Sequence, residues 1–289
     1  MTETDRYFWD LNGYLILRNV LTDDQKAAAN TAVEYYSDQI RVAEDNQGAR
    51  GSDRLKGTGR PTLHGLLQLE KPYCLPFRQM LVHPLIVQHM NEMSGPGWRL
   101  DHGPLIIAGV KGTVGLTLHG AGEPHATSTG YHHQNGASYC GGITVQWQLG
   151  DVNAGDGGFC CVPGSHKVRY PMPTGVRTVD DDMGTVVQPA MKAGDVLFFM
   201  DGALTHGTLP WNADRPRRSV LYKFAGRTTA RTGPAKQVSA PETYWDESIV
   251  SGMTEVQRAV MYGPYSNYGA DLPTLDVTDD GEVVVRQGR

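Results

Sequence analysis

The chain has 289 residues, enough for one large domain, and its 39% hydrophobic and 20% charged residues are typical of a soluble globular protein. The net charge of −5 comes from mixed charges, which gives no indication of a nucleic acid or an anionic membrane as partner. The sequence lacks a signal-peptide pattern, a run of ~20 apolar residues and any CxxC pair, so we expect buried thiols and a cytoplasmic protein. No pattern in the sequence indicates an oligomeric state.

Residues 1–97 are predicted to contain helices and a first strand. Thr22 and Gln25 match a capping box, so a helix is predicted from there to about residue 40. The other elements predicted here are a helix over 3–11 with Phe8 and Leu11 inward, a strand over 14–17 and a helical stretch over 78–94 that Pro84 interrupts.

The segment 41–63 is polar and glycine-rich and shows no apolar period. A mobile surface loop is one interpretation. A lid that orders over a substrate is the other, because long loops in compact domains are often functional.

Residues 98–226 change to short apolar runs separated by Gly- and Pro-rich turns, the pattern of a sandwich or jelly roll. The run 143–149 alternates, so that Thr144, Gln146 and Gln148 share one face. These three side chains line a pocket or face solvent. The other predicted strands cover residues 105–110, 159–162, 186–187, 195–199 and 219–224.

The C-terminal part, 227–289, holds a predicted helix over 254–262 and an apolar strand over 283–285. Its apolar content is too small for a core of its own. We therefore expect a single domain over 1–289, with the core at 98–226 and with 227–289 as an extension packed on it.

The histidines suggest a metal site. His132 and His133 are adjacent, His206 follows a long way along the chain, and Arg217 comes eleven residues later. Non-heme iron sites usually take two His and one carboxylate. However, neither Asp nor Glu stands two residues after any of the ten histidines. The sequence thus offers an amide, Gln134, where a charged ligand is expected.

Three stretches together resemble one family, the phytanoyl-CoA dioxygenase-like enzymes, over about residues 5–226. They are an opening that runs from Phe8 through Gly13 to Leu21; the stretch from Asp151 to Pro163-Gly164-Ser165-His166-Lys167; and the stretch from Gly194-Asp195 through His206-Gly207 to Arg217 and Ser219. The resemblance implies a mainly β fold: a double-stranded β-helix (a cupin-like jelly roll) with flanking N- and C-terminal helices. It also implies that Fe(II) and 2-oxoglutarate bind in the mouth of the barrel.

The resemblance further implies a set of site residues. The family's aromatic-His-x-Asp motif matches Tyr131-His132-His133-Gln134, which gives His132, Gln134 and His206 as metal ligands. The alternative register takes His133 and Asn135, and the two exclude each other because a one-residue slip reverses the faces of a strand. Arg217 would bind the distal carboxylate of 2-oxoglutarate with help from Ser219, unless Arg217 instead forms a surface ion pair with Asp214. His166 is interpreted as structural or as part of the pocket rim, and not as a ligand.

The favoured function is therefore an Fe(II)/2-oxoglutarate-dependent oxygenase that hydroxylates a small molecule, with Thr144, Gln146 and Gln148 as candidate pocket residues. Two alternatives remain. One is a non-catalytic small-molecule-binding protein on the same scaffold, since an amide ligand weakens metal binding. The other is an iron-dependent halogenase, in which Gln134 would stand aside for chloride.

Overall fold

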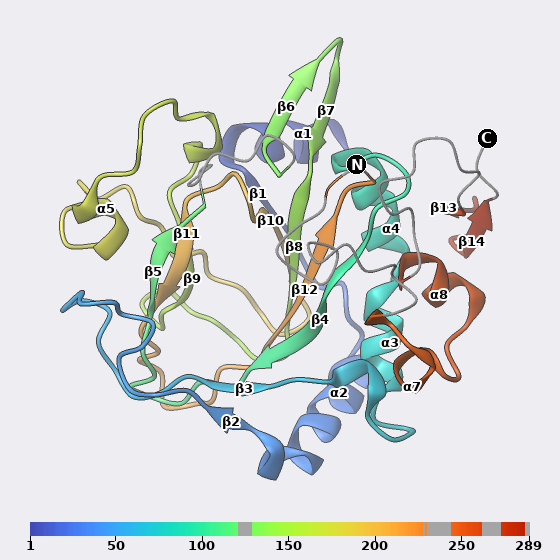
Figure 1. Cartoon of the computed structure of the whole chain (residues 1–289), viewed down its shortest axis with the longest axis horizontal. Helices are drawn as coiled ribbons and strands as arrows, with labels where there is room; N and C mark the ends of the chain where they lie inside the picture. The colour runs from blue at the N-terminus through green and yellow to red at the C-terminus, as the bar shows by residue number, and fades with distance from the viewer. Residues whose placement is uncertain (121–128, 228, 230–243, 262–272, 287–289) are drawn as a thin grey trace.

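Antiparallel strands form the centre of the molecule (Figure 1). The computed structural model describes residues 1–120, 129–227, 229, 244–261 and 273–286. One sheet has seven strands in the order β1-β10-β8-β12-β4-β3-β2, and a second has three in the order β5-β11-β9. The seven strands are β1 (Tyr14–Leu17), β2 (Arg41–Val42), β3 (Pro61–Leu63), β4 (Arg99–Ile107), β8 (Gly142–Gln148), β10 (Val196–Met200) and β12 (Ser219–Ala225); the three are β5 (Leu116–His119), β9 (Gly158–Cys161) and β11 (His206–Leu209).

Helices flank this pair of sheets, and two hairpins lie apart from it. The helices are α1 (Glu3–Asn12), α2 (Asp23–Tyr35), α3 (Leu75–Leu81), α4 (Pro84–Met93), α5 (Thr174–Thr178), α7 (Glu247–Val250) and α8 (Glu255–Met261), with 3-10 turns η1 (Ser37–Gln39), η2 (Leu66–Gln68) and η3 (Ser165–Lys167). The hairpins pair β6 (Tyr131–Gln134) with β7 (Ala137–Cys140), and β13 (Thr274–Val277) with β14 (Val283–Arg286).

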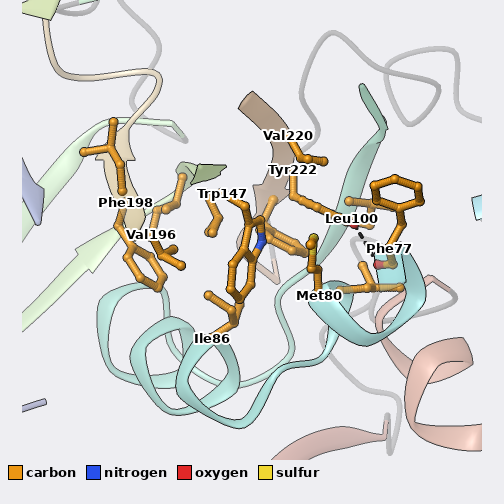
Figure 2. Packing of buried hydrophobic residues seen from close by; sticks show 14 of the residues in the cluster. Phe77, Met80, Ile86, Leu100, Trp147, Val196, Phe198, Val220 and Tyr222 are labelled. Atoms are coloured by element: carbon orange, nitrogen blue, oxygen red, sulfur yellow. Dashed lines mark hydrogen bonds between the residues drawn. The ribbon is translucent and has the colours of Figure 1, made fainter. Parts of the chain in front are cut away.

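The outer face of the large sheet is apolar and is covered by α3 and α4 (Figure 2). Trp147 of β8 and Tyr222 of β12 are fully buried against residues such as Phe77 and Ile86. The hydroxyl of Tyr222 donates to the Phe77 carbonyl at 2.7 Å, which satisfies its one polar atom. Burying each such side chain contributes about 1.5–3 kcal/mol, so this layer holds the helices on the sheet.

The inner face of the large sheet looks toward the three-stranded sheet. Phe159 of β9 packs on Phe199 of β10, with ring centres 4.7 Å apart, and Phe199 is also 4.7 Å from the ring of His206 on β11. Rings from both sheets therefore meet in the interior, as they do in a sandwich or jelly roll. The structure confirms a mainly β jelly-roll core with flanking helices.

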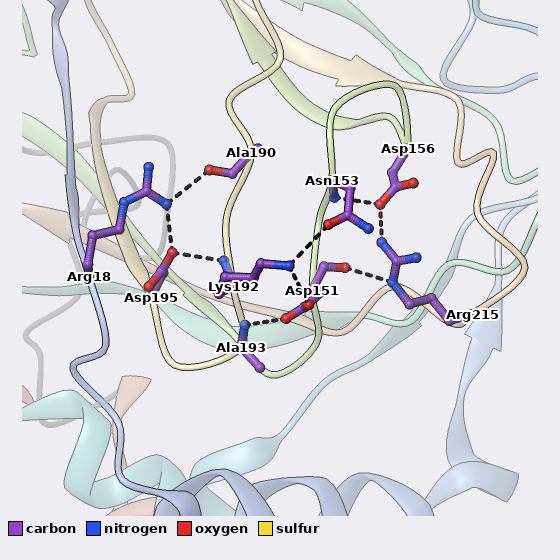
Figure 3. A network of polar contacts seen from close by, with 9 residues as sticks. All are labelled: Arg18, Asp151, Asn153, Asp156, Ala190, Lys192, Ala193, Asp195 and Arg215. Atoms are coloured by element: carbon purple, nitrogen blue, oxygen red, sulfur yellow. Dashed lines mark hydrogen bonds and ion pairs between the residues drawn. The ribbon is translucent and has the colours of Figure 1, made fainter.

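A polar network at the sequence stretches that carried the family resemblance is structural (Figure 3). Buried Asp195 accepts hydrogen bonds from Arg18 at 2.7 Å and from the Lys192 backbone N–H at 2.8 Å. Asp151 accepts from the side chain of Lys192 at 2.8 Å, and Arg215 pairs with Asp156. These contacts fasten the turn before β10 to β1 and to the turn before β9, and so fix the ends of strands that enter the barrel.

The capping box at Thr22 is confirmed, and α2 starts there. Pro84 separates α3 from α4, as predicted. In α1, however, Phe8 and Leu11 are largely exposed and Trp9 is the buried residue, so the predicted inner face was wrong. The four cysteines are free and buried, as expected.

The segment 41–63 is packed rather than loose. It begins with β2, ends with β3, and buries Ala49 and Leu55 completely between them. Its backbone bonds to the start of β5 and to the residue before it: the Gly115 N–H donates to Leu55 O at 2.9 Å and the Thr117 N–H to Gly48 O at 3.0 Å. Most side chains of the segment are nevertheless exposed, as expected for a surface loop. Its short pairings with distant segments leave no local apolar period, so the sequence did not reveal them.

The described part of the C-terminal segment lies on the core. Trp245, Val250, Met261 and Leu275 belong to the same buried cluster as the sheet residues. The predicted strand over 283–285 is β14, which pairs with β13. The run at 186–187 forms a single bridge, Cys161 to Val187, rather than a strand.

Candidate active site

Two histidines face each other across the small sheet. His206 on β11 pairs in register with His119 on β5, and their ring centres are 4.3 Å apart. In each ring Nδ1–H donates to a backbone carbonyl two residues earlier, to Leu204 O at 2.8 Å and to Thr117 O at 3.0 Å. This fixes the tautomer and leaves both Nε2 atoms with a free lone pair, the arrangement found in metal-binding histidines.

Asp201, in the turn after β10, is an acid close to the ring of His206. Its Oδ1 lies 3.8 Å from His206 Nε2, accepts a hydrogen bond from the Thr144 hydroxyl at 2.8 Å and is 3.2 Å from the Lys223 ammonium. Asp201 and His206 are both buried. Among the residues that the structure describes, no three His, Cys, Asp or Glu side chains form a ready-made metal site, so the group is close to such a site without closing it.

Burial keeps the imidazoles neutral. The pKa of His206 falls to about 3, first because the ring is desolvated and then because His119 is beside it. The pKa of His119 is lowered as well, again mainly by burial. Neutral imidazoles are the form that binds metal ions, so these rings are ready to act as ligands at neutral pH.

A second charged group lies at the start of β12. Arg217 is only 4% exposed, and its Nε–H donates to Ser219 Oγ at 3.2 Å. Ser219 in turn donates to Gln148 Oε1 at 2.9 Å. Burial, and then the charge of Arg60, lowers the pKa of Arg217 to about 9. The alternative ion pair with Asp214 is wrong, because Asp214 is exposed and bonds to Lys111.

Arg60 adds a second cation to this end of the barrel. Burial lowers its pKa, and its Nε–H has no hydrogen-bond partner. Among the described residues, no acid forms an ion pair with Arg60 or Arg217. Two desolvated guanidinium groups without a counter-ion are costly, and an anion bound between them would relieve that cost.

The three polar residues of β8 run from one group to the other. Thr144 bonds to Asp201 at the histidine end, and Gln148 bonds to Ser219 at the arginine end. Gln146, between them, is buried, and its amide Nε2 lacks a partner. The interpretation that these residues face solvent is therefore wrong, and Gln146 provides an unused donor on the line from His206 to Arg217.

The structure does not place the residues of the predicted His-x-Gln motif beside His206. His132, His133, Gln134 and Asn135 are exposed on the β6–β7 hairpin, a separate two-stranded sheet that projects from the barrel (Figure 1). The strands that flank β11 are β5 and β9. The position that the motif was expected to fill is taken by His119.

A cavity of about 330 Å³ opens next to this group. Leu105, Leu221 and Lys223 line it from the inner faces of β4 and β12, and His64, Tyr244 and Trp245 line it from outside the sheet. Lys223 also contacts Asp201, so the cavity borders the histidine end of the interior.

Sequence reasoning missed His119, Asp201 and Arg60. Asp201 stands five residues before His206, and His119 ends the short apolar run Leu116–His119. A search limited to acids two residues after a histidine cannot find an acid on another strand. Arg60 carries no signal, because its burial depends on strand pairing across the sheet.

The jelly roll thus carries two imidazoles at one end, of which that of His206 is buried, and two guanidinium groups at the other, of which that of Arg217 is buried. The chain belongs to the phytanoyl-CoA dioxygenase (PhyH) family, whose model matches residues 9–219. The resemblance seen in the sequence is thereby confirmed. No curated protein matches the chain significantly.

Solved structures share the fold at low sequence identity. HygX from Streptomyces hygroscopicus, with nickel, 2-oxoglutarate and hygromycin B bound, is 20% identical with a TM-score of 0.63, over 78% of this chain and 88% of its own. The epimerase SnoN, in complex with Fe3+, alpha ketoglutarate and nogalamycin RO, is 19% identical with a TM-score of 0.59, over 83% and 90%. The carbocyclase SnoK, from nogalamycin biosynthesis, is 18% identical with a TM-score of 0.58, over 81% and 88%. These likenesses establish the common fold.

Proposed function

We propose that the protein is an Fe(II)/2-oxoglutarate-dependent oxygenase that hydroxylates a small molecule. The observation that carries this proposal is a pair of cations, buried Arg217 and partly buried Arg60, which have no acidic partner among the described residues and lie in the same interior as two neutral imidazoles. An interior of this kind fits a ligand that is anionic at one end and chelates a metal at the other. 2-Oxoglutarate is such a ligand.

Two buried nitrogen atoms without hydrogen-bond partners, Nε of Arg60 and Nε2 of Gln146, support the fit of 2-oxoglutarate. In the proposed complex the distal carboxylate accepts hydrogen bonds from Arg217, Ser219 holds the Arg217 side chain in place, and Arg60 neutralises the remaining charge. The Nε2 of Gln146 donates to the co-substrate further along the interior. Binding therefore satisfies groups that the free protein leaves desolvated and unpaired.

The donor set at the other end suits iron. His119 and His206 present neutral Nε2 atoms, whose orientation is fixed by the hydrogen bonds at Nδ1. When bound, iron and 2-oxoglutarate supply the oxidising chemistry: O2 and the 2-oxo acid are consumed, succinate and CO2 are released, and a substrate C–H bond becomes C–OH. The proposal uses His119 in place of His132, His133 and the amides of β6.

The cavity beside Lys223 is the proposed substrate site. Its lining is mainly apolar, with Leu105, Leu221 and Trp245 as walls and the Lys223 ammonium at its inner end. A volume of about 330 Å³ suits a small molecule. HygX and SnoN bind hygromycin B and nogalamycin RO, respectively, which supports a small-molecule substrate for this scaffold.

Anaerobic titration of 2-oxoglutarate, followed by tryptophan fluorescence, tests the proposal. Arg217→Lys keeps the charge but loses the paired hydrogen bonds, so we expect the affinity for 2-oxoglutarate to fall about 10- to 100-fold. Arg218→Lys, one residue along and paired with Glu34, is the matched control and should bind like the wild type. Iron- and O2-dependent formation of succinate would establish catalysis. A wild type that binds neither iron nor 2-oxoglutarate would instead support the alternative of a non-catalytic binding protein.

A further inference from the structure

Iron sites with two histidines usually have one carboxylate ligand as well, and the proposed metal site lacks that carboxylate at its usual position. In the common arrangement a carboxylate follows a histidine by two residues on one strand. His119 is followed by Gly120 and Ala121, and His206 by Gly207 and Thr208. The acid therefore has to come from another element, or the site has none.

We propose that Asp201, in the turn after β10, supplies this carboxylate, so that His119, His206 and Asp201 bind the iron. This inference rests on the proposed function and adds a ligand set to it. The strand β5, the turn after β10 and the strand β11 contribute one ligand each.

The geometry of the two rings supports the proposal. Imidazoles at adjacent positions of an octahedral ion, with metal–nitrogen distances near 2.1 Å, have ring centres about 4.5 Å apart. The ring centres of His119 and His206 are 4.3 Å apart. The Nδ1 hydrogen bonds to Thr117 O and Leu204 O hold them in these orientations. Little rearrangement of either ring is needed.

Asp201 needs a small movement to complete the set. Adjacent ligand atoms on such an ion are about 3 Å apart. Asp201 Oδ1 is 3.8 Å from His206 Nε2, so a shift of less than about 1 Å closes the gap. Its carboxylate is also held by Thr144 at 2.8 Å and lies against the ammonium of Lys223 at 3.2 Å.

Lys223 explains how the buried acid is tolerated without a metal. An unpaired carboxylate in this interior would be strongly destabilising. The ammonium neutralises Asp201 from the side of the substrate cavity, and the divalent ion would take over that role from the side of the histidines. Lys223 therefore neutralises Asp201 without being a metal ligand itself.

Metal binding of isosteric variants tests this assignment. Co(II) is titrated anaerobically into the full chain, with visible absorbance as the readout and 2-oxoglutarate present. Asp201→Asn keeps the acceptor for Thr144 but removes the charge, and we expect its Co(II) affinity to fall more than about 100-fold, beyond the usual loss for an outer-shell residue. His119→Gln should behave in the same way. Both variants should still bind 2-oxoglutarate through Arg217.

Three control variants separate the alternatives. His132→Gln on β6 and Glu123→Gln, at the first acid after His119 in the sequence, should each keep the wild-type affinity for Co(II) within about threefold. Lys223→Met should keep or raise that affinity, because its ammonium competes with the ion for Asp201. Normal Co(II) binding by Asp201→Asn would overturn the proposal. So would a loss in His132→Gln or Glu123→Gln that Asp201→Asn does not share, and so would equal losses in Lys223→Met and Asp201→Asn, since Asp201 would then serve only as the partner of Lys223. A wild type that binds no metal would refute the oxygenase function itself.

Discussion

At the scale of single residues, Gln146 is expected to lower the stability of the protein without ligand and to raise its affinity for 2-oxoglutarate. Its Nε2 is buried without a partner, and an unsatisfied donor of this kind costs about 1–3 kcal/mol. Gln146→Leu removes the donor at similar volume. We expect the variant to unfold at a higher denaturant concentration without ligand, and its affinity for 2-oxoglutarate to fall about 10-fold or more.

Gln148→Leu is the matched control for this prediction. It lies two residues along the same strand, but its Oε1 already accepts from Ser219. Its replacement should therefore destabilise the free protein, because Ser219 would lose its acceptor. If both variants shift stability in the same direction, then Gln146 is satisfied by groups such as bound water and its proposed role fails.

Residue identity alone revealed part of the site. His206, Arg217 and Ser219 were identified from their order in the sequence, and the structure buries all three in one interior. Gln134 was chosen by the same logic but lies on an exposed hairpin. The difference is physical. Arg217 and Ser219 follow His206 at the start of the next strand, whereas the partner strand of β11 is set by non-local pairing that spacing does not encode.

At the scale of elements, α1 is joined to the turn that contains His166. Gly13 ends α1 in a left-handed conformation with φ 77°, and a Cβ there would lie 2.5 Å from His166 Nδ1. The Nε2–H of His166 donates to Asp10 O at 2.9 Å. The Pro-Gly-Ser-His-Lys sequence thus serves to attach the first helix, as its structural interpretation predicted.

This contact should make stability depend on pH. Burial lowers the pKa of His166 to about 4, and its Nδ1 is buried without a partner. The unfolded chain, with a pKa near 6.5, binds the proton first, so the contribution to stability is complete above about pH 6.5 and is lost as the pH falls toward 4. His166→Gln keeps the donor to Asp10 O but cannot be protonated.

Urea unfolding at several pH values checks this prediction. Between pH 6.5 and 4, the free energy of unfolding should fall less steeply in His166→Gln than in the wild type, by at most the slope of one proton, about 1.4 kcal/mol per pH unit. Above pH 7 the two slopes should coincide. Parallel curves over the whole range would mean that His166 titrates normally in the folded state.

Predicting elements from sequence succeeded where the signal was local. The capping box at Thr22 and the break at Pro84 fix helix ends within a few residues, and both were correct. Strands β2, β3 and β5 were not predicted, because they are two to four residues long and are defined by distant partners. His119 ends β5, a strand of only four residues, and was therefore not recognised as a neighbour of His206.

At the scale of the whole molecule, the large sheet separates two environments. Its outer face is apolar and carries α3 and α4, while its inner face carries Thr144, Gln146, Gln148, Ser219 and Lys223. A polar interior contributes less to stability than an apolar one of equal size. The fold therefore depends on its outer layer for stability and keeps the interior for ligands, a division that proteins commonly show at functional sites.

This division predicts that Arg217 lowers the stability of the free protein. Arg217→Met keeps the length of the side chain and removes a desolvated cation that Arg60 repels. We expect the free energy of unfolding without ligand to rise by about 1–3 kcal/mol, as when other buried charges are replaced by apolar side chains. With 2-oxoglutarate at 100 times its Kd, the wild type should gain about 2.7 kcal/mol and the variant almost nothing. The order of stability should therefore shift toward the wild type, or reverse, when ligand is added, which denaturant unfolding with and without 2-oxoglutarate would show. A variant that is less stable than the wild type in both conditions would mean that the guanidinium of Arg217 stabilises the fold. Arg217 would then not be a binding site for the carboxylate of 2-oxoglutarate.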